Sequence, residues 1–355
     1  MKILALNLPQ FHEVKENNEW WGRGFTEWTN VKKAKPLYKG HLQPLVPLGE
    51  NYYDLSKIEN IKWQADLAQS YGVSGFVYFH YWYEGEHLLE KPCEILLKNP
   101  DVDIEYCFCW ANHPWTRAWD GKQHNILKEQ TYGNVEDWEK HLNYLIPFFK
   151  DSRYEKKDNK PVLFIYNASD IKNYDEMISY WSDRLIQNGF SGIYTVEYIS
   201  TKNPKVYGKF TDAVYEDEPM NCARFEITNI QKLRRLFSKK MKRIDYLDYD
   251  NLWKLILAKT KTYGKCQIVQ GAFCAWDNSP RRGNSGSTIV TGASPEKFEK
   301  YLIKMLEGNR DCVSNDYIII NAWNEWGEGA ILEPSEQFGY SYLEAVKHAV
   351  ELHRK

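Results

Sequence analysis

The sequence has little that suits a disulfide-stabilised, zinc-binding or membrane-spanning protein. Its seven cysteines are an odd number without a C-x-x-C pair, so we expect neither a disulfide framework nor a zinc site. No apolar run approaches the ~20 residues that a membrane-spanning helix needs. The N-terminus also lacks the apolar stretch and cleavage site of a secretory leader. We therefore expect a cytoplasmic protein with reduced thiols, unless a leader was removed.

The sequence also lacks the usual features of nucleotide binding and a strong charge of one sign. The net charge is −2, so no overall field attracts nucleic acid. No Gly-rich phosphate loop follows an expected strand. Two Asp-x-Asp matches, at Asp101 and at Asp248, are expected to be accidental: the first precedes a strand, and the second lies where a helix needs an N-cap. We expect neither a cofactor nor a metal ion.

What the chain does contain is a regular alternation of short apolar runs with amphipathic segments. Eight expected strands cover Ile3–Leu8, Gly75–Tyr81, Ile104–Trp110, Val162–Tyr166, Ile193–Tyr198, Ala213–Tyr215, Ile268–Ala275 and Tyr317–Ala322. The helices expected between and after them cover Ile58–Tyr71, Pro92–Leu97, Val135–Phe149, Asp175–Gln187, Tyr249–Thr262, Pro295–Leu306 and Tyr342–His353. This alternation predicts an α/β fold, a (β/α)8 TIM barrel with loop insertions, spanning residues 1–355 as one domain. An open doubly wound sheet is the alternative.

The most informative segment is Asn321–Gly329, which follows the buried-strand pattern of Ile318–Ile320. It places Glu325 and Glu328 among tryptophans and glycines, at the strand end where barrel enzymes carry their catalytic groups. Paired carboxyl groups with aromatic walls are typical of glycoside chemistry. We therefore expect Glu325 and Glu328 to be catalytic, with Asn324 and Trp326 beside the substrate. A solvated loop with incidental acids is the alternative.

Other polar and aromatic residues fall at the same predicted rim. Candidates for holding sugar hydroxyls are His12, His80, Tyr81, Asn112, Trp115, Arg117 and Asp277. Candidates for stacking on sugar rings are Trp28, Trp82 and Trp276. Each could instead fix a loop or pack in the core. Arg281 and Arg282 could engage an acidic group of the substrate, but a salt bridge to the acidic cluster Glu216–Glu218 is favoured.

A basic insertion is expected near residues 220–248. Lys232–Arg243 contains seven basic residues, and apolar residues recur around it near helical spacing. A surface helix packed on the barrel is the simpler interpretation. The alternative is docking onto an anionic membrane surface, peripheral to the inner membrane, or onto a lipid-linked glycan.

Taken together, these motifs resemble a known family. The resemblance covers nearly the whole chain and rests on Leu8–His12, Glu19–Trp28, His80–Trp82, Trp110–Asn112 with Trp115–Arg117, Ala275–Asn278 with Arg281–Gly283, and Trp323–Gly329. These are similar to the WbsX-like proteins of bacterial surface-polysaccharide gene clusters. That group is related to glycoside hydrolase family 99, the endo-acting α-mannosidases.

The resemblance implies a (β/α)8 fold and a specific division of labour between the two acids. In the hydrolases, the acid matching Glu325 assists attack by the sugar's own 2-hydroxyl group, and the acid matching Glu328 acts as general acid and then base, so that configuration is retained. The residues alone leave the stereochemistry open. We expect an enzyme that cleaves or transfers glycosyl, mannoside-like units of a surface polysaccharide or its precursor. A nucleotide-sugar glycosyltransferase of O-antigen or capsule biosynthesis and a non-catalytic glycan-binding protein are the alternatives.

Overall fold

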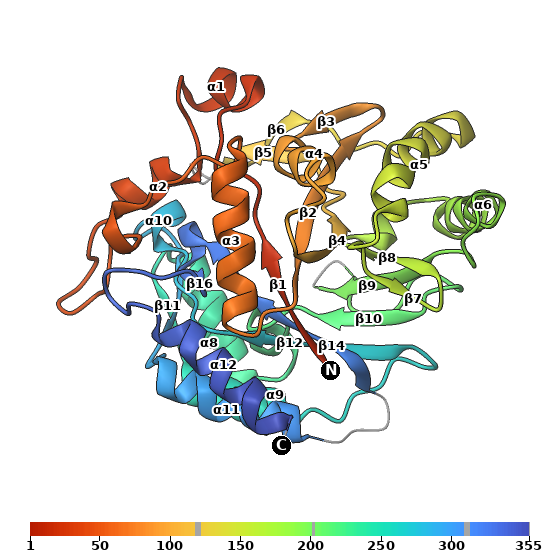
Figure 1. Cartoon of the computed structure of the whole chain (residues 1–355). Coiled ribbons are helices and arrows are strands. Elements are labelled where there is room, and N and C mark those ends of the chain that lie inside the picture. The colour runs from red at the N-terminus through yellow and green to blue at the C-terminus, as the bar shows by residue number, and fades with distance from the viewer. Residues whose placement is uncertain (118–121, 201–202, 309–312, 355) are drawn as a thin grey trace.

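The protein is a closed barrel of eight parallel strands. The computed structural model describes residues 1–117, 122–200, 203–308 and 313–354 (Figure 1). In chain order the barrel strands are β1 (Lys2–Asn7), β2 (Gly75–Tyr83), β4 (Glu105–Trp110), β8 (Lys160–Ile165), β9 (Tyr194–Ile199), β10 (Ala213–Glu216), β12 (Gln267–Phe273) and β14 (Val313–Asn321). Around the barrel the order is β1, β14, β12, β10, β9, β8, β4 and β2, which pairs with β1 again. The predicted (β/α)8 fold is confirmed.

The helices lie outside this barrel, close to their predicted positions. They are α3 (Ile58–Ser70), α4 (Lys91–Lys98), α5 (Val135–Lys150), α6 (Tyr174–Gln187), α9 (Tyr249–Leu257), α11 (Pro295–Glu307) and α12 (Ser341–His353). Asp248 begins α9 as an N-cap, because its side chain accepts a hydrogen bond from the Asn251 amide at 2.7 Å. The second Asp-x-Asp match is therefore a helix cap, as predicted.

The chain departs from regular alternation on either side of β10. Residues 203–212, between β9 and β10, contain no helix. After β10 the chain forms α7 (Met220–Phe225), α8 (Asn229–Lys240) and β11 (Asp245–Asp248) before α9. Strand β11 pairs in parallel with β13 (Thr288–Thr291), which follows β12, so the insertion is fastened to a neighbouring barrel loop.

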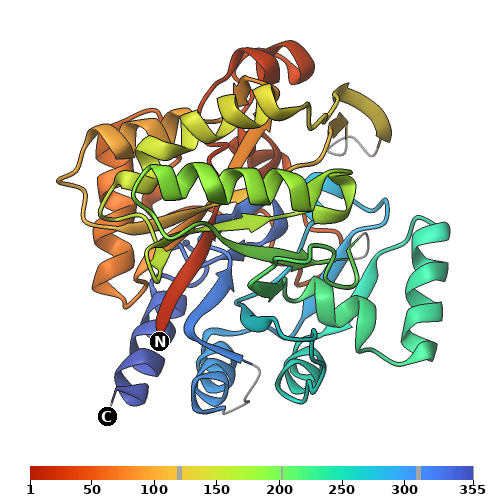
Figure 2. The same cartoon turned by 90° about the vertical axis from the view of Figure 1, so that its right-hand side faces the viewer.

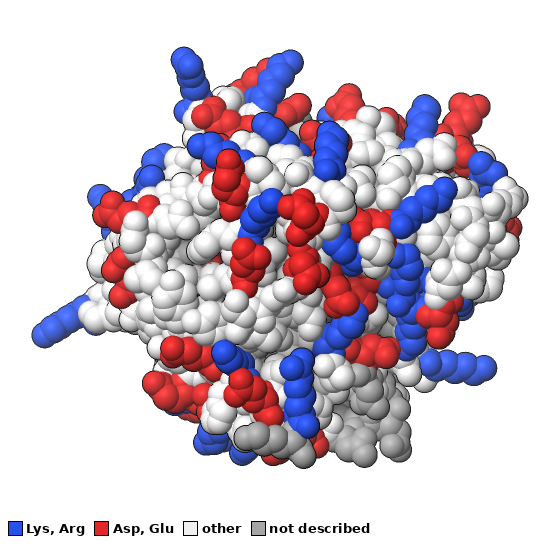
Figure 3. Space-filling model, in the orientation of Figure 1, with Lys and Arg blue, Asp and Glu red and all other residues white. Residues whose placement is uncertain are grey.

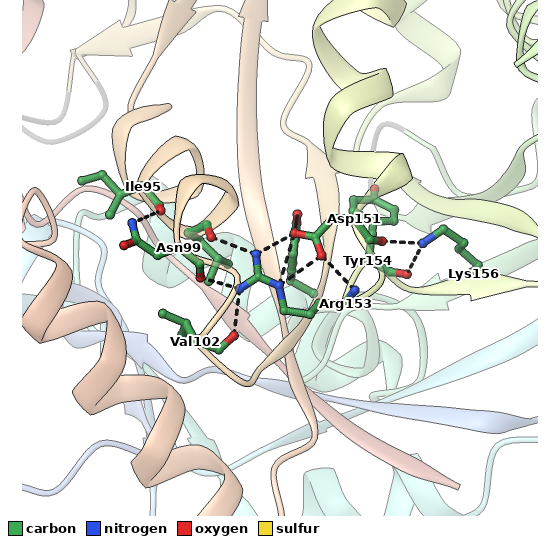
Figure 4. A network of polar contacts seen from close by, with 9 residues as sticks. Ile95, Asn99, Val102, Asp151, Arg153, Tyr154 and Lys156 are labelled. Atoms are coloured by element: carbon green, nitrogen blue, oxygen red, sulfur yellow. Dashed lines mark hydrogen bonds and ion pairs between the residues drawn. The ribbon is translucent and has the colours of Figure 1, made fainter.

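At the end of the barrel opposite the predicted site, Arg153 ties the end of α4 to the loop before β4 (Figure 4). Its guanidinium donates to the carbonyl oxygens of Leu96 and Val102, each at 2.8 Å, and to that of Asn99 at 3.0 Å. These contacts satisfy carbonyl groups at the C-terminal end of α4 and in the loop before β4. The first Asp-x-Asp match, Asp101–Asp103, lies in this loop, and Asp101 forms an exposed ion pair with Lys62 at 2.6 Å.

The surface shows no strong charge of one sign on the face seen in Figure 3, where acidic and basic side chains are interspersed. This mixture agrees with the net charge of −2. The described cysteines are free thiols, five of them buried. Within the ranges described, none of the helices has the length and apolar character that crossing a bilayer requires.

Candidate active site

Three loop segments meet at the C-terminal ends of three neighbouring barrel strands. Helix α2 (Glu27–Lys33) follows β1, helix α10 (Ser279–Arg282) follows β12, and β15 (Asn324–Glu325) with the short helix η4 (Trp326–Glu328) follows β14. Strand β14 lies between β1 and β12 in the barrel, so the three segments converge although they are far apart in sequence. Figure 1 shows α2 and α10 close together at this end of the barrel.

The side chain of Arg281 joins the three segments. Its Nη2 lies 2.8 Å from Glu325 Oε2 and 2.9 Å from Glu27 Oε1, and its Nη1 lies 2.7 Å from Glu328 Oε1. A planar guanidinium presents its donors in a fixed fork, so it fixes the carboxyl groups relative to one another. The sequence favours a salt bridge from Arg281 or Arg282 to Glu216–Glu218. That expectation is wrong for Arg281; within that acidic cluster, Glu216 and Glu218 pair with Lys259.

Gly327 makes this arrangement possible. A Cβ atom at this position would overlap Glu27 Oε1 and would lie 2.7 Å from Arg281 Nε. The absence of a side chain therefore lets Glu27 and Arg281 pass directly against the backbone between the two predicted acids. The Asp277 amide donates to the Glu328 carbonyl oxygen at 2.6 Å, which ties the β12 loop to the same segment.

The cluster holds three carboxyl groups and one guanidinium in a largely buried setting. The side chain of Glu27 is fully buried, that of Glu325 is 10% exposed and that of Glu328 is 24% exposed. Burial raises the pKa of Glu325 to about 8; Arg281 opposes this rise, whereas the charges of Glu328 and Glu27 add to it. Burial also raises the pKa of Glu27, again against the effect of Arg281. The site therefore retains a proton on a carboxyl group near neutral pH.

Other side chains face the acids from the rest of the barrel mouth. Tyr81, at the end of β2, has a pKa raised by burial and then by the charge of Glu325, and its ring packs edge-on against Trp115 at 5.1 Å. On another side, Asp217 follows β10 and has a pKa raised to about 7 by burial, with contributions from Glu218 and Glu328. Burial raises the pKa of Tyr166, after β8, and the charges of Asp217 and Glu328 add to this rise. Tyr81 and Trp115 thus form an aromatic pair at the end of β2, and their contact with a sugar stays a prediction.

Asn324 and Trp326 support the acid-bearing loop from behind. Asn324 is fully buried; its Oδ1 accepts from the Leu8 amide at 2.7 Å and its Nδ2 donates to the Leu8 carbonyl oxygen at 3.0 Å. Trp326 donates from Nε1 to Glu333 Oε2 at 2.7 Å. These contacts fix the chain on both sides of Glu325. The structure gives both residues contacts that position the acids; that they lie beside the substrate stays a prediction.

Asp277 also has structural partners. Its Oδ2 lies 2.7 Å from His41 Nε2 and accepts from Gln43 Nε2 at 2.8 Å, while its Oδ1 accepts from the Ser279 amide at 2.9 Å. The last contact is made to the first residue of α10, the helix that carries Arg281. Asp277 therefore holds α10 in place, and Trp276 before it is buried in the main core.

Several other residues that were predicted at the rim are buried and contact protein groups. Trp28 is buried against Trp326, with 5.4 Å between ring centroids, and donates to the Tyr53 carbonyl oxygen. Asn112 bridges β4 and β8: its Oδ1 accepts from the Asn167 amide and its Nδ2 donates to the Asn167 carbonyl oxygen, both at 2.8 Å. His12 is buried, and its Nδ1 lies 3.0 Å from the Pro9 carbonyl oxygen.

His80 and Trp82 lie on the opposite face of β2 from Tyr81. His80 Nε2 lies 2.8 Å from His141 Nε2 in helix α5, and Trp82 stacks on the His141 ring at 4.4 Å. Burial lowers the pKa of His80 to about 3, so this imidazole is neutral. Both residues pack between the barrel and α5. Arg117 ends the short strand β5 (Trp115–Arg117), but its side chain lies outside the described part of the structure.

Glu27, Asp217 and Tyr166 are not among the site residues predicted from the sequence. Glu27 stood inside a motif that carries the family resemblance, but nothing local signals that it faces an arginine 254 positions away. Asp217 and Tyr166 follow barrel strands directly, so their position at strand ends was the available signal.

A family model described as "Glycosyltransferase WbsX" matches residues 3–346 of the chain. The chain belongs to the WbsX family. An uncharacterised WxcX protein of Xanthomonas campestris pv. campestris is 31% identical over 351 residues, as is its counterpart in a second strain. In both cases the match covers 98% of this chain and 49% of the relative, so the chain spans about half the length of these curated relatives.

Solved structures show the same fold at low sequence identity. A family 99 endo-α-mannosidase from Bacteroides thetaiotaomicron has a TM-score of 0.56 and 13% identity, covering 99% of this chain and 97% of that one. A structure described as a glycoside hydrolase-like protein gives a TM-score of 0.60 and 14% identity, with 98% and 93% covered. A family 5, subfamily 18 protein from Streptomyces cattleya gives 0.51 and 9%, with 100% and 80% covered. These similarities support the barrel fold.

Proposed function

We propose that the chain cleaves or transfers glycosyl units of a bacterial surface polysaccharide or its precursor, with Glu325 and Glu328 as its acid–base pair. The observation that carries this proposal is the meeting of both carboxyl groups at Arg281, in the mouth of the barrel. Glycosidic chemistry requires two carboxyl groups beside the scissile bond, one able to give a proton and one able to take it.

Glu325 is the proposed base. Its reactive form is then the carboxylate, and because burial raises its pKa to about 8, the fraction in that form grows as the pH rises toward 8. In the proposed reaction, Glu325 takes the proton of the sugar's 2-hydroxyl group while that oxygen attacks the anomeric carbon. The bond from that carbon to the leaving oxygen breaks at the same time. Glu328, the more exposed of the two, donates a proton to the leaving oxygen.

The second half of the proposed reaction returns both protons. Attack by the 2-oxygen has left a 1,2-anhydro-sugar. Glu328, now ionised, takes a proton from an acceptor hydroxyl group or water, and the acceptor oxygen attacks the anomeric carbon and opens the anhydro ring. The 2-oxygen recovers its proton from Glu325. Water as acceptor gives hydrolysis, whereas a sugar hydroxyl gives transfer, so the same two acids serve both outcomes. Retention of configuration follows from two successive displacements.

Two similarities support the class of substrate. The family model carries a glycosyltransferase description, and a protein of the same fold is an endo-α-mannosidase. A mannoside-like unit inside a longer chain is therefore the proposed substrate. Tyr81, whose pKa is raised in part by the charge of Glu325, packs on Trp115, and this ring pair is the proposed aromatic wall for such a sugar.

The test is to incubate the chain with purified bacterial surface polysaccharides and α-mannosyl oligosaccharides, and to follow products by mass spectrometry. We expect new shortened or extended glycans without any added nucleotide sugar. Product that forms only when a nucleotide sugar is supplied would favour the nucleotide-sugar glycosyltransferase instead. Tight glycan binding with no product from any substrate would favour a binding protein.

A further inference from the structure

Helix α8 turns its apolar side chains toward solvent. Ile230 is 82% exposed, Leu233 69% and Phe237 57%, and Leu236 and Met241 are also exposed. Spacings of three and four residues place these side chains on one face of the helix. A surface helix normally buries such a stripe against the core. In α8 the apolar stripe faces solvent instead.

Polar contacts hold the opposite face of α8 to the protein. Arg235 is buried, and its Nε donates to Asp245 Oδ2 at 2.6 Å while Nη1 donates to the Ala223 carbonyl oxygen. Arg234 donates to the Tyr246 carbonyl oxygen at 2.9 Å. A pocket of about 190 Å³ on this side is lined by Gln231, Arg234 and Arg235 among others. Figure 2 shows α8 at the right-hand edge, standing out from the barrel.

The same segment is strongly basic. Residues 227–244 contain no acidic residue and seven basic ones, which are Lys232, Arg234, Arg235, Lys239, Lys240, Lys242 and Arg243. If two copies met through this face, like charges would be brought together, which opposes self-association. An apolar stripe bordered by lysine and arginine is instead complementary to an anionic bilayer, where the apolar groups enter the interface and the cations meet the headgroups.

We propose that α8 lies on the surface of an anionic membrane, with Ile230, Leu233 and Phe237 inserted at the level of the headgroups. Lys240, Lys242 and Arg243, which are exposed, contact the lipid phosphates. The proposal concerns a surface separate from the acid pair. It does not depend on the chemistry proposed for Glu325 and Glu328.

Contacts connect this surface to the candidate active site. Tyr246, in β11 beside α8, packs edge-on against Tyr38 at 5.8 Å, and Tyr38 stacks on His41 at 4.6 Å. His41 lies 2.7 Å from Asp277, whose loop carries Arg281. A membrane held by α8 would therefore lie beside the same edge of the barrel mouth. A glycan attached to a lipid could reach the acids from there.

The experiment is sedimentation of the full chain with vesicles of phosphatidylcholine alone or of equimolar phosphatidylcholine and phosphatidylglycerol. We expect binding to the anionic vesicles at low salt, weaker binding as salt rises, and much weaker binding to the neutral vesicles. The double variant Leu233→Ser/Phe237→Ser should reduce partitioning by at least about tenfold, since each side chain loses its apolar burial. The triple variant Lys240→Gln/Lys242→Gln/Arg243→Gln should reduce it by about fivefold per residue.

Matched controls make the result specific. Ile186→Ser/Phe210→Ser replaces side chains that are 55% and 61% exposed but lie outside α8, and Lys57→Gln/Lys172→Gln/Lys300→Gln removes exposed charges elsewhere. Both controls should bind vesicles like the wild type, and thermal unfolding should confirm that every variant is folded. Equal vesicle binding by the α8 variants and the controls would overturn the proposal. So would a dimer in solution that Leu233→Ser/Phe237→Ser converts to a monomer, or the absence of wild-type binding to either vesicle.

Discussion

Glu27 Oε1 lies 2.9 Å from Nη2 of Arg281, so a carboxyl group from the first barrel loop holds the guanidinium that contacts both predicted acids. Glu27 is the first residue of α2, where its amide donates to the Gln10 carbonyl oxygen at 3.0 Å. The start of a helix favours a negative charge. Glu27 is therefore a positioning residue, acting on Glu325 and Glu328 through Arg281.

Replacing Arg281 by methionine should destabilise the fold and abolish turnover. The change leaves three carboxyl groups of a largely buried cluster without their counter-charge, and breaking a buried ion pair from one side costs about 3–5 kcal/mol. Urea denaturation measures the loss. The neighbouring Arg282 is exposed, and Arg282→Met should change stability by no more than about 0.5 kcal/mol. Equal stability of the two variants would contradict the central role given to Arg281.

The raised pKa of Glu325 predicts a pH dependence of stability. Its pKa is about 8 in the folded protein and about 4.3 in an unfolded chain, so between these values the folded state binds more protons. Stability from this group is therefore present at low pH and falls as pH rises toward 8. Glu325→Gln removes the titration, so its thermal stability relative to wild type should rise from pH 5 to pH 8. A constant difference across that range would show that Glu325 is not perturbed.

Glu27→Gln should move the titration of Glu325 to lower pH. The charge of Glu27 contributes to the raised pKa of Glu325, so removing it makes Glu325 easier to ionise. If Glu325 acts as a base, kcat/KM rises as it ionises, and this rise should occur at lower pH in Glu27→Gln. The exposed Glu59, changed to Gln, serves as the control. An unmoved profile would remove Glu27 from the site, whereas a fall of activity with ionisation would make Glu325 the acid.

Gly327→Ala should disturb the cluster without changing any charged group. Its Cβ would overlap Glu27 and crowd Arg281, so one of these side chains must leave its position. Forcing an extra methyl group into a packed site costs about 1–3 kcal/mol. Gly308→Ala, whose Cβ would meet its nearest neighbour at 3.3 Å, is the milder control. Calorimetric unfolding and turnover should both separate the two variants; matching results would show that the site accommodates a side chain at 327.

The barrel and the acid-bearing loop could be predicted because both have local signals. Apolar runs such as Ile318–Ile320 mark buried strands, and the motif after them marks a strand end. The directions of rim side chains were harder to predict. His80 and Trp82 face α5, whereas Tyr81 between them faces the site, as the alternation of a strand requires. Applying that alternation to β2 would have separated these residues.

Long-range partners had no such signal. The approach of Glu27 to Arg281 depends on the order of β1, β14 and β12 around the barrel, and on a glycine at 327 that leaves room for both. The orientation of α8 was likewise not visible in its pattern. An amphipathic helix predicts an apolar face, but the ion pair of Arg235 with Asp245 decides which face points outward.

The proposed roles of Glu325 and Glu328 are tested most directly by the turnover of Glu325→Gln and Glu328→Gln on a glycan that the wild type processes. Each amide keeps the shape of the side chain and loses proton transfer, so turnover should fall by about 10²–10⁴-fold in each variant. Glycan affinity and thermal unfolding should stay near those of the wild type, and Glu59→Gln should keep full activity. Wild-type turnover in both acid variants would contradict the claim that these two residues carry the reaction.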